Sequence, residues 1–397
     1  MYSLQVLKFA MNAQRFLIRS YVAQHCVCMT LLRNTHETMQ SSKCHLARFL
    51  DQVDCISSPC SLQSPGMPAH SLELRNENSK YFSEKCREQR SSRTCRHSYI
   101  PLFALALFQT KKDTEKEEKR QESELIMTIK RSILALQRGE LNKAEQLLHI
   151  SLKIAQESQN TQAETYIFDL MANLAYQREQ YTKAEELFKE VLKRMFSDGM
   201  AEDDNAVVEI SLKLASVYAS IGDMEKAVQG FHFCIGTQEE KIKKYGESNL
   251  DEDTLLLWAM SMDWYARFLL SLKKYELAKK HFLKAFEMSE RVHGPGHPQT
   301  AVLLNDIGSV CSLQKNYTDA ITYLERAIYV AREAQSPDIA SFYVNLGAVY
   351  LQQGMLAEAE KHCKEGLKLA KNYKNEEALE EAKSCLEEIS SVKSGTK

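Results

Sequence analysis

The fold of this chain is decided by residues 340–373, which read ASFYVNLGAVYLQQGMLAEAEKHCKEGLKLAKNY. Two small residues, Gly347 and Ala359, lie twelve positions apart on either side of Gly354, which suits a tight turn. Two helices approach closely only where their side chains are small. The pattern therefore predicts an antiparallel helical hairpin that crosses at Gly347 and Ala359.

The same pattern recurs five more times toward the N-terminus. The small residue of each second helix, here called the marker residue, recurs at spacings of 40, 43, 51, 42 and 39 residues. The six marker residues are Ala144, Ala184, Ala227, Ala278, Ala320 and Ala359. Twelve positions earlier the residues are also small, namely Ser132, Ala172, Ala215, Ala266, Gly308 and Gly347. Four positions later most are large, namely Leu148, Phe188, Phe231, Phe282, Leu324 and Cys363. We expect each large residue to fill the space against the next hairpin.

This pattern is that of the tetratricopeptide repeat, a pair of helices in about 34 residues. It predicts an all-α fold, a right-handed superhelical solenoid of about six tetratricopeptide helix-turn-helix repeats over residues 125–391. The longest insertion, 242–258, lies between hairpins, and Pro298 is predicted to begin a helix. An apolar face on residues 375–391 predicts a C-terminal capping helix, followed by a disordered tail at 392–397.

The N-terminal residues have the composition of a targeting signal. Residues 1–36 contain basic residues and no acid before Glu37, and on a helix their apolar and basic side chains fall on opposite sides. A mitochondrial transit peptide requires this combination, so we predict one here; the alternative is an unstructured basic tail. Residues 37–98 are polar and charged, and are predicted to be disordered or partly removed.

A short apolar run, residues 99–108, precedes the repeats. It has half of the ~20 residues that a spanning helix needs, so we predict that it associates with a membrane by inserting partway or lying in the interface. The alternative is that it docks on the first repeat. Residues 109–124 are predicted to form a charged linker.

Charge divides the chain into two parts. Residues 1–98 hold 13 Lys and Arg against 7 Asp and Glu, and the remainder holds 38 against 46. Because the repeats are mildly acidic, nucleic acid is not an expected partner. The eleven cysteines follow no zinc-binding spacing, and no secretory signal precedes them. We therefore expect free thiols in a reducing compartment.

Motifs of catalysis and cofactor binding do not occur in the sequence. It contains no phosphate-binding loop and no HExxH or GxSxG motif. His293 and His297 lie four residues apart, but two glycines and a proline separate them. We interpret them as part of a connector and not as a metal pair. The prediction is that the chain has no enzyme activity, no metal or cofactor and no small-molecule substrate, and that it functions by binding proteins.

Protein binding requires a surface. In a solenoid of this type the first helix of each hairpin lines the concave side, and counting from the repeat pattern predicts which side chains are exposed there. These predicted partner-binding residues are Asp169, Asn173, Lys213, Ser216, Asp263, Trp264, Arg267, Asn305, Asp306 and Asn345. Amides such as Asn305 and Asn345 suit a partner's backbone, and a Trp beside an Arg suits an anchor point. The alternative for each is an ordinary solvated helix face.

Three stretches together resemble one family, that of the mitochondrial tetratricopeptide repeat protein 19. They are residues 168–176 (FDLMANLAY), 202–218 (EDDNAVVEISLKLASVY) and 297–300 (HPQT). The resemblance covers roughly residues 125–391. It implies a factor at the mitochondrial inner membrane that helps to assemble or maintain respiratory complex III, the cytochrome bc1 complex. It also implies an association with the Rieske iron–sulfur subunit and the removal of its processing fragments, without catalytic residues.

Two other functions predict features that the sequence lacks. A cytosolic cargo adaptor resembling the kinesin light chains, which carry a similar HPQT connector, would have a long heptad coiled coil before the repeats. A peptidase acting on Rieske fragments would have a nucleophile with its base, or a metal site. The sequence therefore favours a non-enzymatic scaffold whose partners are complex III subunits.

Overall fold

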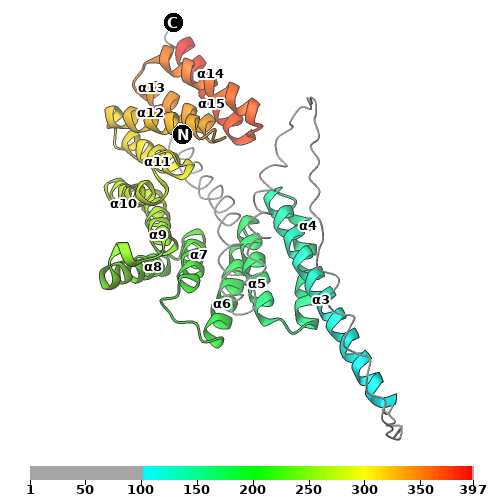
Figure 1. The fold of residues 1–397 in the computed structure, drawn as a ribbon. Coiled ribbons are helices and arrows are strands. Elements are labelled where there is room, and N and C mark those ends of the chain that lie inside the picture. The colour runs from blue at the N-terminus through cyan, green and yellow to red at the C-terminus, as the bar shows by residue number, and fades with distance from the viewer. Residues whose placement is uncertain (1–101, 396–397) are drawn as a thin grey trace, which may run out of the picture. The chain divides into compact units, whose positions relative to one another are not determined.

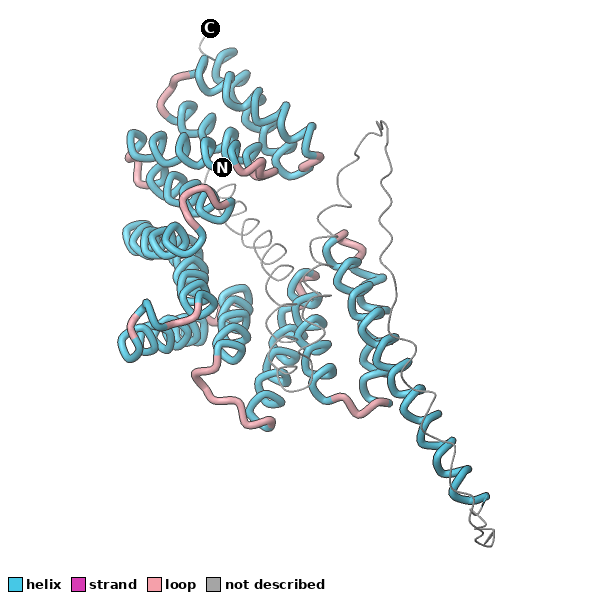
Figure 2. Tube along the Cα trace, viewed as in Figure 1, coloured by secondary structure: helices cyan, strands magenta, loops and turns pink. Residues whose placement is uncertain are grey.

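The computed structural model describes residues 102–395, and for residues 102–119 and 395 it gives the course of the helix alone. The predicted transit peptide (1–36) and the segment 37–98 lie outside the described residues. Within residues 102–395 there are thirteen α-helices, one 3-10 helix and no strand (Figure 1). Figure 2 shows the helices joined by short loops throughout the repeats. The prediction of an all-α solenoid of tetratricopeptide hairpins is confirmed.

The helices alternate between the first and second members of six hairpins. The first helices are α3 (Leu102–Gln137), α5 (Thr161–Gln177), α7 (Asn205–Ile221), α9 (Glu252–Ser271), α11 (Pro298–Leu313) and α13 (Ile339–Gln352). The second helices are α4 (Leu141–Glu157), α6 (Tyr181–Ser197), α8 (Met224–Tyr245), α10 (Tyr275–His293), α12 (Tyr317–Glu333) and α14 (Leu356–Tyr373). A last helix, α15 (Glu376–Gly395), packs on α14 and α13. Each hairpin contacts the next one along the chain, as stacked repeats do.

The described residues fall into two units. Residues 122–395 belong to one compact unit, which holds the repeats. The turns of α3 from Leu102 to Gln121 belong to the other unit, of which only this helix is described. Residues 102–108 of the apolar run and the whole of the predicted charged linker (109–124) are thus helical. No helix in the described part of the chain is long and apolar enough to cross a bilayer.

The repeat register agrees with the sequence pattern. Each second helix begins three residues before its marker residue; α12 begins at Tyr317, and its marker Ala320 is fully buried. A Cβ atom built on Gly308 would lie 2.8 Å from Cγ of Leu324 and 3.1 Å from the carbonyl oxygen of Ala320. The two helices therefore cross where the sequence predicts. One detail differs: Leu324 packs against the small residue of its own hairpin, because positions four apart share a helix face.

Replacing Gly308 with leucine is expected to destabilise the protein by roughly 1–3 kcal/mol, because the new side chain has no room against Leu324 and the backbone of Ala320. Urea unfolding of the purified proteins measures the difference. The matched control is Gly236→Ala, since no atom lies within 4 Å of the added Cβ and alanine favours a helix. Equal stability of G308L and the parent would show that the hairpin crosses elsewhere.

The turns inside the hairpins share one backbone conformation. Three use the predicted glycines, Gly139, Gly222 and Gly354, with φ of 72°, 92° and 77°. The other three use Glu179, Lys273 and Lys315 at the same repeat position, with φ of 61°, 60° and 61°. A residue with a Cβ adopts this left-handed region at a cost of about 1–2 kcal/mol. Packing of the flanking helices, and not turn chemistry, therefore closes these three hairpins.

The connector before α11 is built as the sequence predicts. Pro298 is the first residue of the helix, and His297 caps it: the backbone N–H of Gln299 donates to Nδ1 of His297 at 3.1 Å. The rings of His293 and His297 stack with their centroids 4.1 Å apart. The long insertion extends α8 and α9 and adds a 3-10 turn at Glu247–Asn249 between them.

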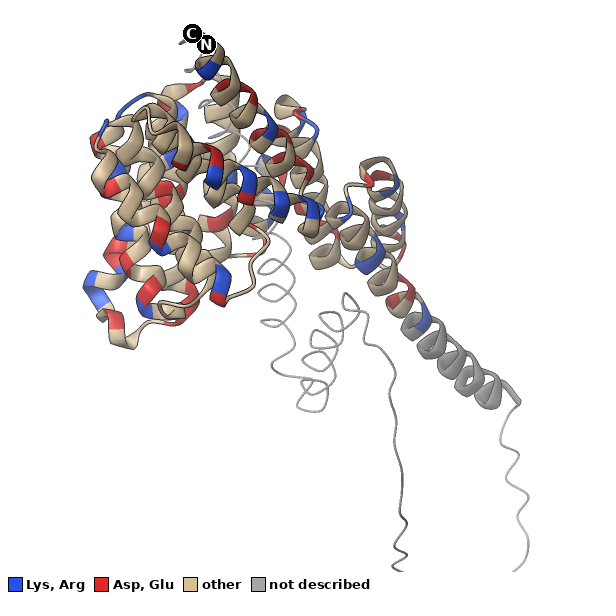
Figure 3. Cartoon of the chain, turned by 90° about the horizontal axis from the view of Figure 1, so that it is seen from above, with Lys and Arg blue, Asp and Glu red and all other residues tan. Residues whose placement is uncertain are grey.

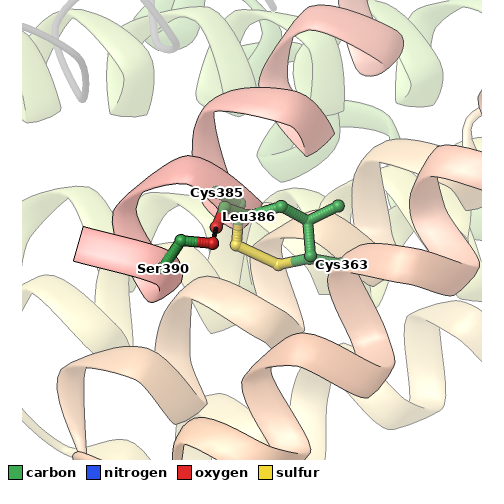
Figure 4. The surroundings of a disulfide bond; sticks show 4 residues. All are labelled: Cys363, Cys385, Leu386 and Ser390. Atoms are coloured by element: carbon green, nitrogen blue, oxygen red, sulfur yellow. Dashed lines mark hydrogen bonds between the residues drawn. A yellow bond between two sulfur atoms is a disulfide. The ribbon is translucent and has the colours of Figure 1, made fainter. Parts of the chain in front are cut away.

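The capping helix α15 buries Ala378, Ala382, Cys385 and Ile389. It continues to Gly395, so the predicted start of a disordered tail at 392 is too early. Cys385 forms a disulfide with Cys363 of α14, whose Cα lies 6.4 Å away (Figure 4). The expectation of free thiols is therefore wrong for this pair. The two cysteines are 22 residues apart, and only the turn between α14 and α15 brings them together.

Replacing Glu381 of α15 with glutamine is expected to stabilise the protein by roughly 1–3 kcal/mol at pH 8, with little effect at pH 4.5. Burial, together with the nearby carboxylate of Glu377, raises the pKa of Glu381 from 4.5 to about 7. The folded state thus favours the neutral carboxyl. The stability of the folded state therefore falls as the pH rises from about 4.5, where Glu381 ionises in the unfolded chain, to about 7, where it ionises in the folded protein.

Thermal unfolding of parent and variant across this pH range tests the Glu381 prediction. Glu380→Gln is the control on the same helix, because the Glu380 carboxylate is exposed and pairs with Lys383. A Glu381→Gln variant whose melting temperature parallels that of the parent at every pH would contradict the prediction.

Candidate functional site

The ten residues predicted to bind a partner lie on five first helices, α5, α7, α9, α11 and α13. Nine of them are buried, each with at most 6% of its surface exposed, and Asn345 is half-buried. The expectation that these side chains are exposed is therefore wrong. The reason is chemical: most of them pair with complementary side chains, many on the next first helix. We call this set of ten residues, together with Glu209, the polar ladder.

The first rung of the polar ladder joins α5 to α7. Nζ of Lys213 lies 3.1 and 3.3 Å from the two carboxylate oxygens of Asp169. It also lies 2.9 Å from Oε1 of Glu209, one turn earlier on its own helix. The side chain of Asn173 donates to Asp169 at 3.1 Å, and the hydroxyls of Tyr176 and Ser216 are 3.1 Å apart. A buried ammonium is thus neutralised by two carboxylates from neighbouring helices.

The second rung joins α9 to α11 through an ion triad. Nε of Arg267 donates to Asp263 at 3.1 Å, and its NH2 group donates to Asp306. All three side chains are buried. Burial raises the pKa of both carboxyls, although the charge of Arg267 opposes the rise. At Asp306 the negative charge of Asp263 raises the pKa further. Burial by itself lowers the pKa of the Arg267 guanidinium. The two carboxylates outweigh this effect, so the pKa of Arg267 is raised.

The third rung joins α11 to α13 through neutral groups. The side-chain amide of Asn345 donates to Oδ1 of Asn305 at 2.8 Å. Nearer the ends of the same helices, the hydroxyl of Ser312 donates to Gln352 at 2.9 Å. Asn305 and Asn345 were predicted to contact a partner's backbone, but in the structure they contact each other.

Trp264 has a different environment. It lines a cavity of about 30 Å³ together with Asp263, Ser289 and His293. A cavity of this size holds a water molecule, whereas a small-molecule ligand needs about 300 Å³ or more. Trp264 therefore belongs to the packing between α9, α10 and α11 in this structure and does not project as an anchor.

One polar cluster was not predicted from the sequence. The side chain of Asn205, the first residue of α7, donates to Thr254 of α9 at 2.8 Å. It accepts hydrogen bonds from Gln238 at 3.2 Å and from Lys241 at 2.9 Å, both on α8. The only sequence signal is that Asn205 opens a helix beside the long insertion. That signal predicts a helix start, not a contact 49 residues away.

The chemistry of these groups is that of structural pairing. Their carboxylates accept hydrogen bonds from cations and amides. The nearby core cysteine Cys234 is also unreactive, because burial raises the pKa of its thiol and keeps it protonated. Among residues 120–394, whose side chains the structure describes, no group of three or more metal-binding side chains occurs. Lys, Arg, Asp and Glu are interspersed over the described helices (Figure 3). The arrangement is suited to holding a protein-binding surface in shape.

An open hollow on the surface lies beside this ladder, at the ends of α5 and α7 and the start of α6. It is lined by Tyr181, Lys183, Ser220, Ile221 and their neighbours. Ile221 and the adjacent Met224 are among the large apolar side chains that stay exposed. Exposed apolar side chains beside a hollow offer a protein partner apolar contact.

Comparison with known proteins places the chain among repeat proteins. The tetratricopeptide repeat family matches residues 256–333 and again residues 340–373. The chain is 36% identical to "Tetratricopeptide repeat protein 19 homolog, mitochondrial" of Drosophila melanogaster, over 76% of this chain and 80% of that protein. It is 39% identical to "Tetratricopeptide repeat protein 19, mitochondrial" of Homo sapiens, over 68% of this chain and 73% of that protein.

Among solved structures, the chain is similar to aspartyl phosphate phosphatase F from Bacillus subtilis. The sequence identity is 20% and the TM-score is 0.48, over 69% of this chain and 73% of that chain.

Proposed function

This chain belongs to the mitochondrial tetratricopeptide repeat protein 19 family, and from that premise we propose that it is a non-enzymatic scaffold of respiratory complex III. In this proposal it works at the mitochondrial inner membrane, supports assembly or maintenance of the complex, and assists turnover of Rieske iron–sulfur subunit fragments. The observation that carries the proposal is 36% and 39% identity to relatives over 80% and 73% of their lengths. The mitochondrial names of these relatives favour this function over a cytosolic cargo adaptor.

The partner surface in this proposal is the side of the solenoid formed by the first helices. The polar ladder fixes the spacing of α5 to α7, of α9 to α11 and of α11 to α13 by buried pairs. A surface with fixed spacing loses little entropy when it docks on a partner. The buried ladder residues thus position the surface. At its edge, exposed Ile221 at the end of α7 and exposed Met224 at the start of α8 provide apolar contact near the hollow.

The experiment is a pull-down of the tagged full chain from mildly solubilised mitochondria, with partners identified by mass spectrometry. Recovery of complex III subunits, including the Rieske protein, is the expected result. An I221E/M224E variant is expected to fold and to lose those subunits, because both side chains are exposed. The matched control is Tyr329→Glu, also exposed but on α12. Absence of the chain from mitochondria, or recovery of kinesin heavy chain instead, would refute the proposal.

A second experiment separates a scaffold from a peptidase. Loss of the chain from cells is expected to let Rieske fragments accumulate, whereas the purified chain incubated with those fragments is expected to leave them intact. Cleavage by the purified chain alone would overturn the scaffold proposal. Extraction of the organelle membranes at high pH tests whether residues 99–108 hold the chain at the inner membrane.

A further inference from the structure

The sixth hairpin and the capping helix meet through unusually small side chains. Four residues after the marker, the other hairpins carry leucine or phenylalanine, whereas α14 carries Cys363. The buried residues of α14 are Ala359, Cys363, Gly366 and Ala370. Those of α15 are Ala378, Ala382, Cys385 and Ile389. Because hydrophobic stabilisation scales with the apolar area buried, each of these small side chains contributes less than a leucine or phenylalanine would at its position.

One further feature weakens the docking of α15, and another explains why a cysteine fits at position 363. Oε2 of Glu381 is buried and has no hydrogen-bond partner, and an unsatisfied buried carboxyl opposes docking. On the other side, Gly347 of α13 leaves the space that the Cys363 sulfur occupies, since a Cβ atom there would collide with Sγ. The backbone thus makes room for a sulfur atom at a position where the other repeats place a bulky hydrocarbon.

The disulfide lies within the cluster of buried side chains that α14 and α15 share. Figure 4 shows Cys363 and Cys385 joined between α14 and α15, with Leu386 beside them. The hydroxyl of Ser390 donates to the carbonyl of Leu386 at 2.9 Å, one turn along α15. The other cysteines of the repeats, Cys234 and Cys311, are buried and free. A covalent link thus stands at the repeat position where the other five hairpins bury a leucine or phenylalanine.

We propose that Cys363 and Cys385 form a reversible thiol–disulfide pair that controls the docking of α15 on α13 and α14. In the oxidising direction the co-reactant is a low-molecular-weight disulfide such as oxidised glutathione. The Cys385 thiolate, the more exposed of the two, attacks one sulfur of that disulfide and releases one thiolate. The Cys363 thiolate then attacks the Cys385 sulfur and releases the second. One S–S bond breaks, one forms, and the two cysteine protons end on the two released thiols.

The consequence of reduction is release of the cap. Without the covalent link, α15, a terminal helix with small buried side chains, opens more readily by local unfolding. Opening uncovers apolar residues of α13 and α14 that pack in the same cluster, including Val344, Leu351 and Leu367. Since a terminal cap covers the apolar end of a repeat array, the redox state of the pair decides whether that end is closed or open to a partner. This proposal does not depend on the complex III assignment.

The test uses the purified full chain in buffers of defined reduced and oxidised glutathione. Alkylation of free thiols followed by mass spectrometry reports whether Cys363 and Cys385 are joined. Hydrogen exchange reports opening of α15. In the parent we expect exchange of the α15 amides to become at least about tenfold faster on reduction, with α9 changing little. The C363A/C385A variant should exchange rapidly in both buffers, and Cys311→Ala, which keeps the pair, should behave like the parent.

Two outcomes would overturn the proposal. One is that Cys363 and Cys385 stay alkylatable under oxidising glutathione, so that no disulfide forms. The other is that the disulfide forms and is reduced, but exchange of the α15 amides is the same in both states. Because C363A/C385A lacks the sulfurs altogether, any effect of glutathione on that variant would be assigned to other cysteines.

Discussion

Replacing Arg267 with alanine is expected to destabilise the protein by roughly 3–5 kcal/mol, the largest effect of any single change considered for the polar ladder. The reason is that the Arg267 guanidinium is the partner of two buried carboxylates, Asp263 and Asp306. Its removal leaves both buried carboxylates without a counter-charge. Equilibrium unfolding in urea at pH 7 measures the loss.

The control for Arg267 is Arg291→Ala. Arg291 also pairs with a carboxylate, that of Glu247, but both side chains are about half exposed. An exposed pair of this kind contributes roughly 0–1 kcal/mol. Arg267→Met combined with Asp263→Asn and Asp306→Asn should recover much of the loss, because no uncompensated charge remains buried. If R267A and R291A were equally stable, the triad would not be buried as the structure shows.

Replacing Phe282 with alanine is expected to cost roughly 3–5 kcal/mol. Phe282 of α10 is fully buried in the main hydrophobic cluster, four residues after the marker Ala278. The Arg267 guanidinium lies over its ring, 5.7 Å from the centroid. Truncation therefore removes apolar contact and leaves a cavity beneath the ion triad.

The matched control for Phe282 is Leu277→Ala on the same helix, where the leucine is 49% exposed. A change at an exposed position is expected to shift stability by no more than about 0.5 kcal/mol. Thermal unfolding of the three proteins makes the comparison. A loss at Phe282 no greater than at Leu277 would show that the large residue of the repeat pattern does not face the core.

The fold could be predicted because its determinants repeat. The small residues at the crossing and the large residue four positions later recur with fixed offsets, so six weak signals reinforce one another. In the structure all six second helices begin three residues before their marker residues, so the register of the pattern is kept throughout. The turns at Glu179, Lys273 and Lys315 could not be predicted from residue type, because charged residues do not favour a positive φ.

The candidate site was predicted only in part, for a physical reason. Counting along a helix says which side a residue is on, and the ten predicted residues do lie on the first helices. Counting does not show which side chain of the neighbouring helix faces that residue. Lys213 and Asp169 are 44 residues apart, and Arg267 and Asp306 are 39 apart. Only the stacking of the hairpins shows that the charge of one helix is cancelled by the next. Likewise, only the packing of α15 on α14 shows that Cys363 and Cys385 meet.

The rungs of the polar ladder also bear on how such an array changes during evolution. Each junction has its own chemistry: an ammonium with carboxylates at Asp169–Lys213, a guanidinium triad at Arg267, and an amide pair at Asn305–Asn345. A duplicated or transposed hairpin would bring a buried charge to a junction that offers no counter-charge. Repeat number and order in this chain are thus protected against recombination in a way that arrays of interchangeable consensus repeats are not.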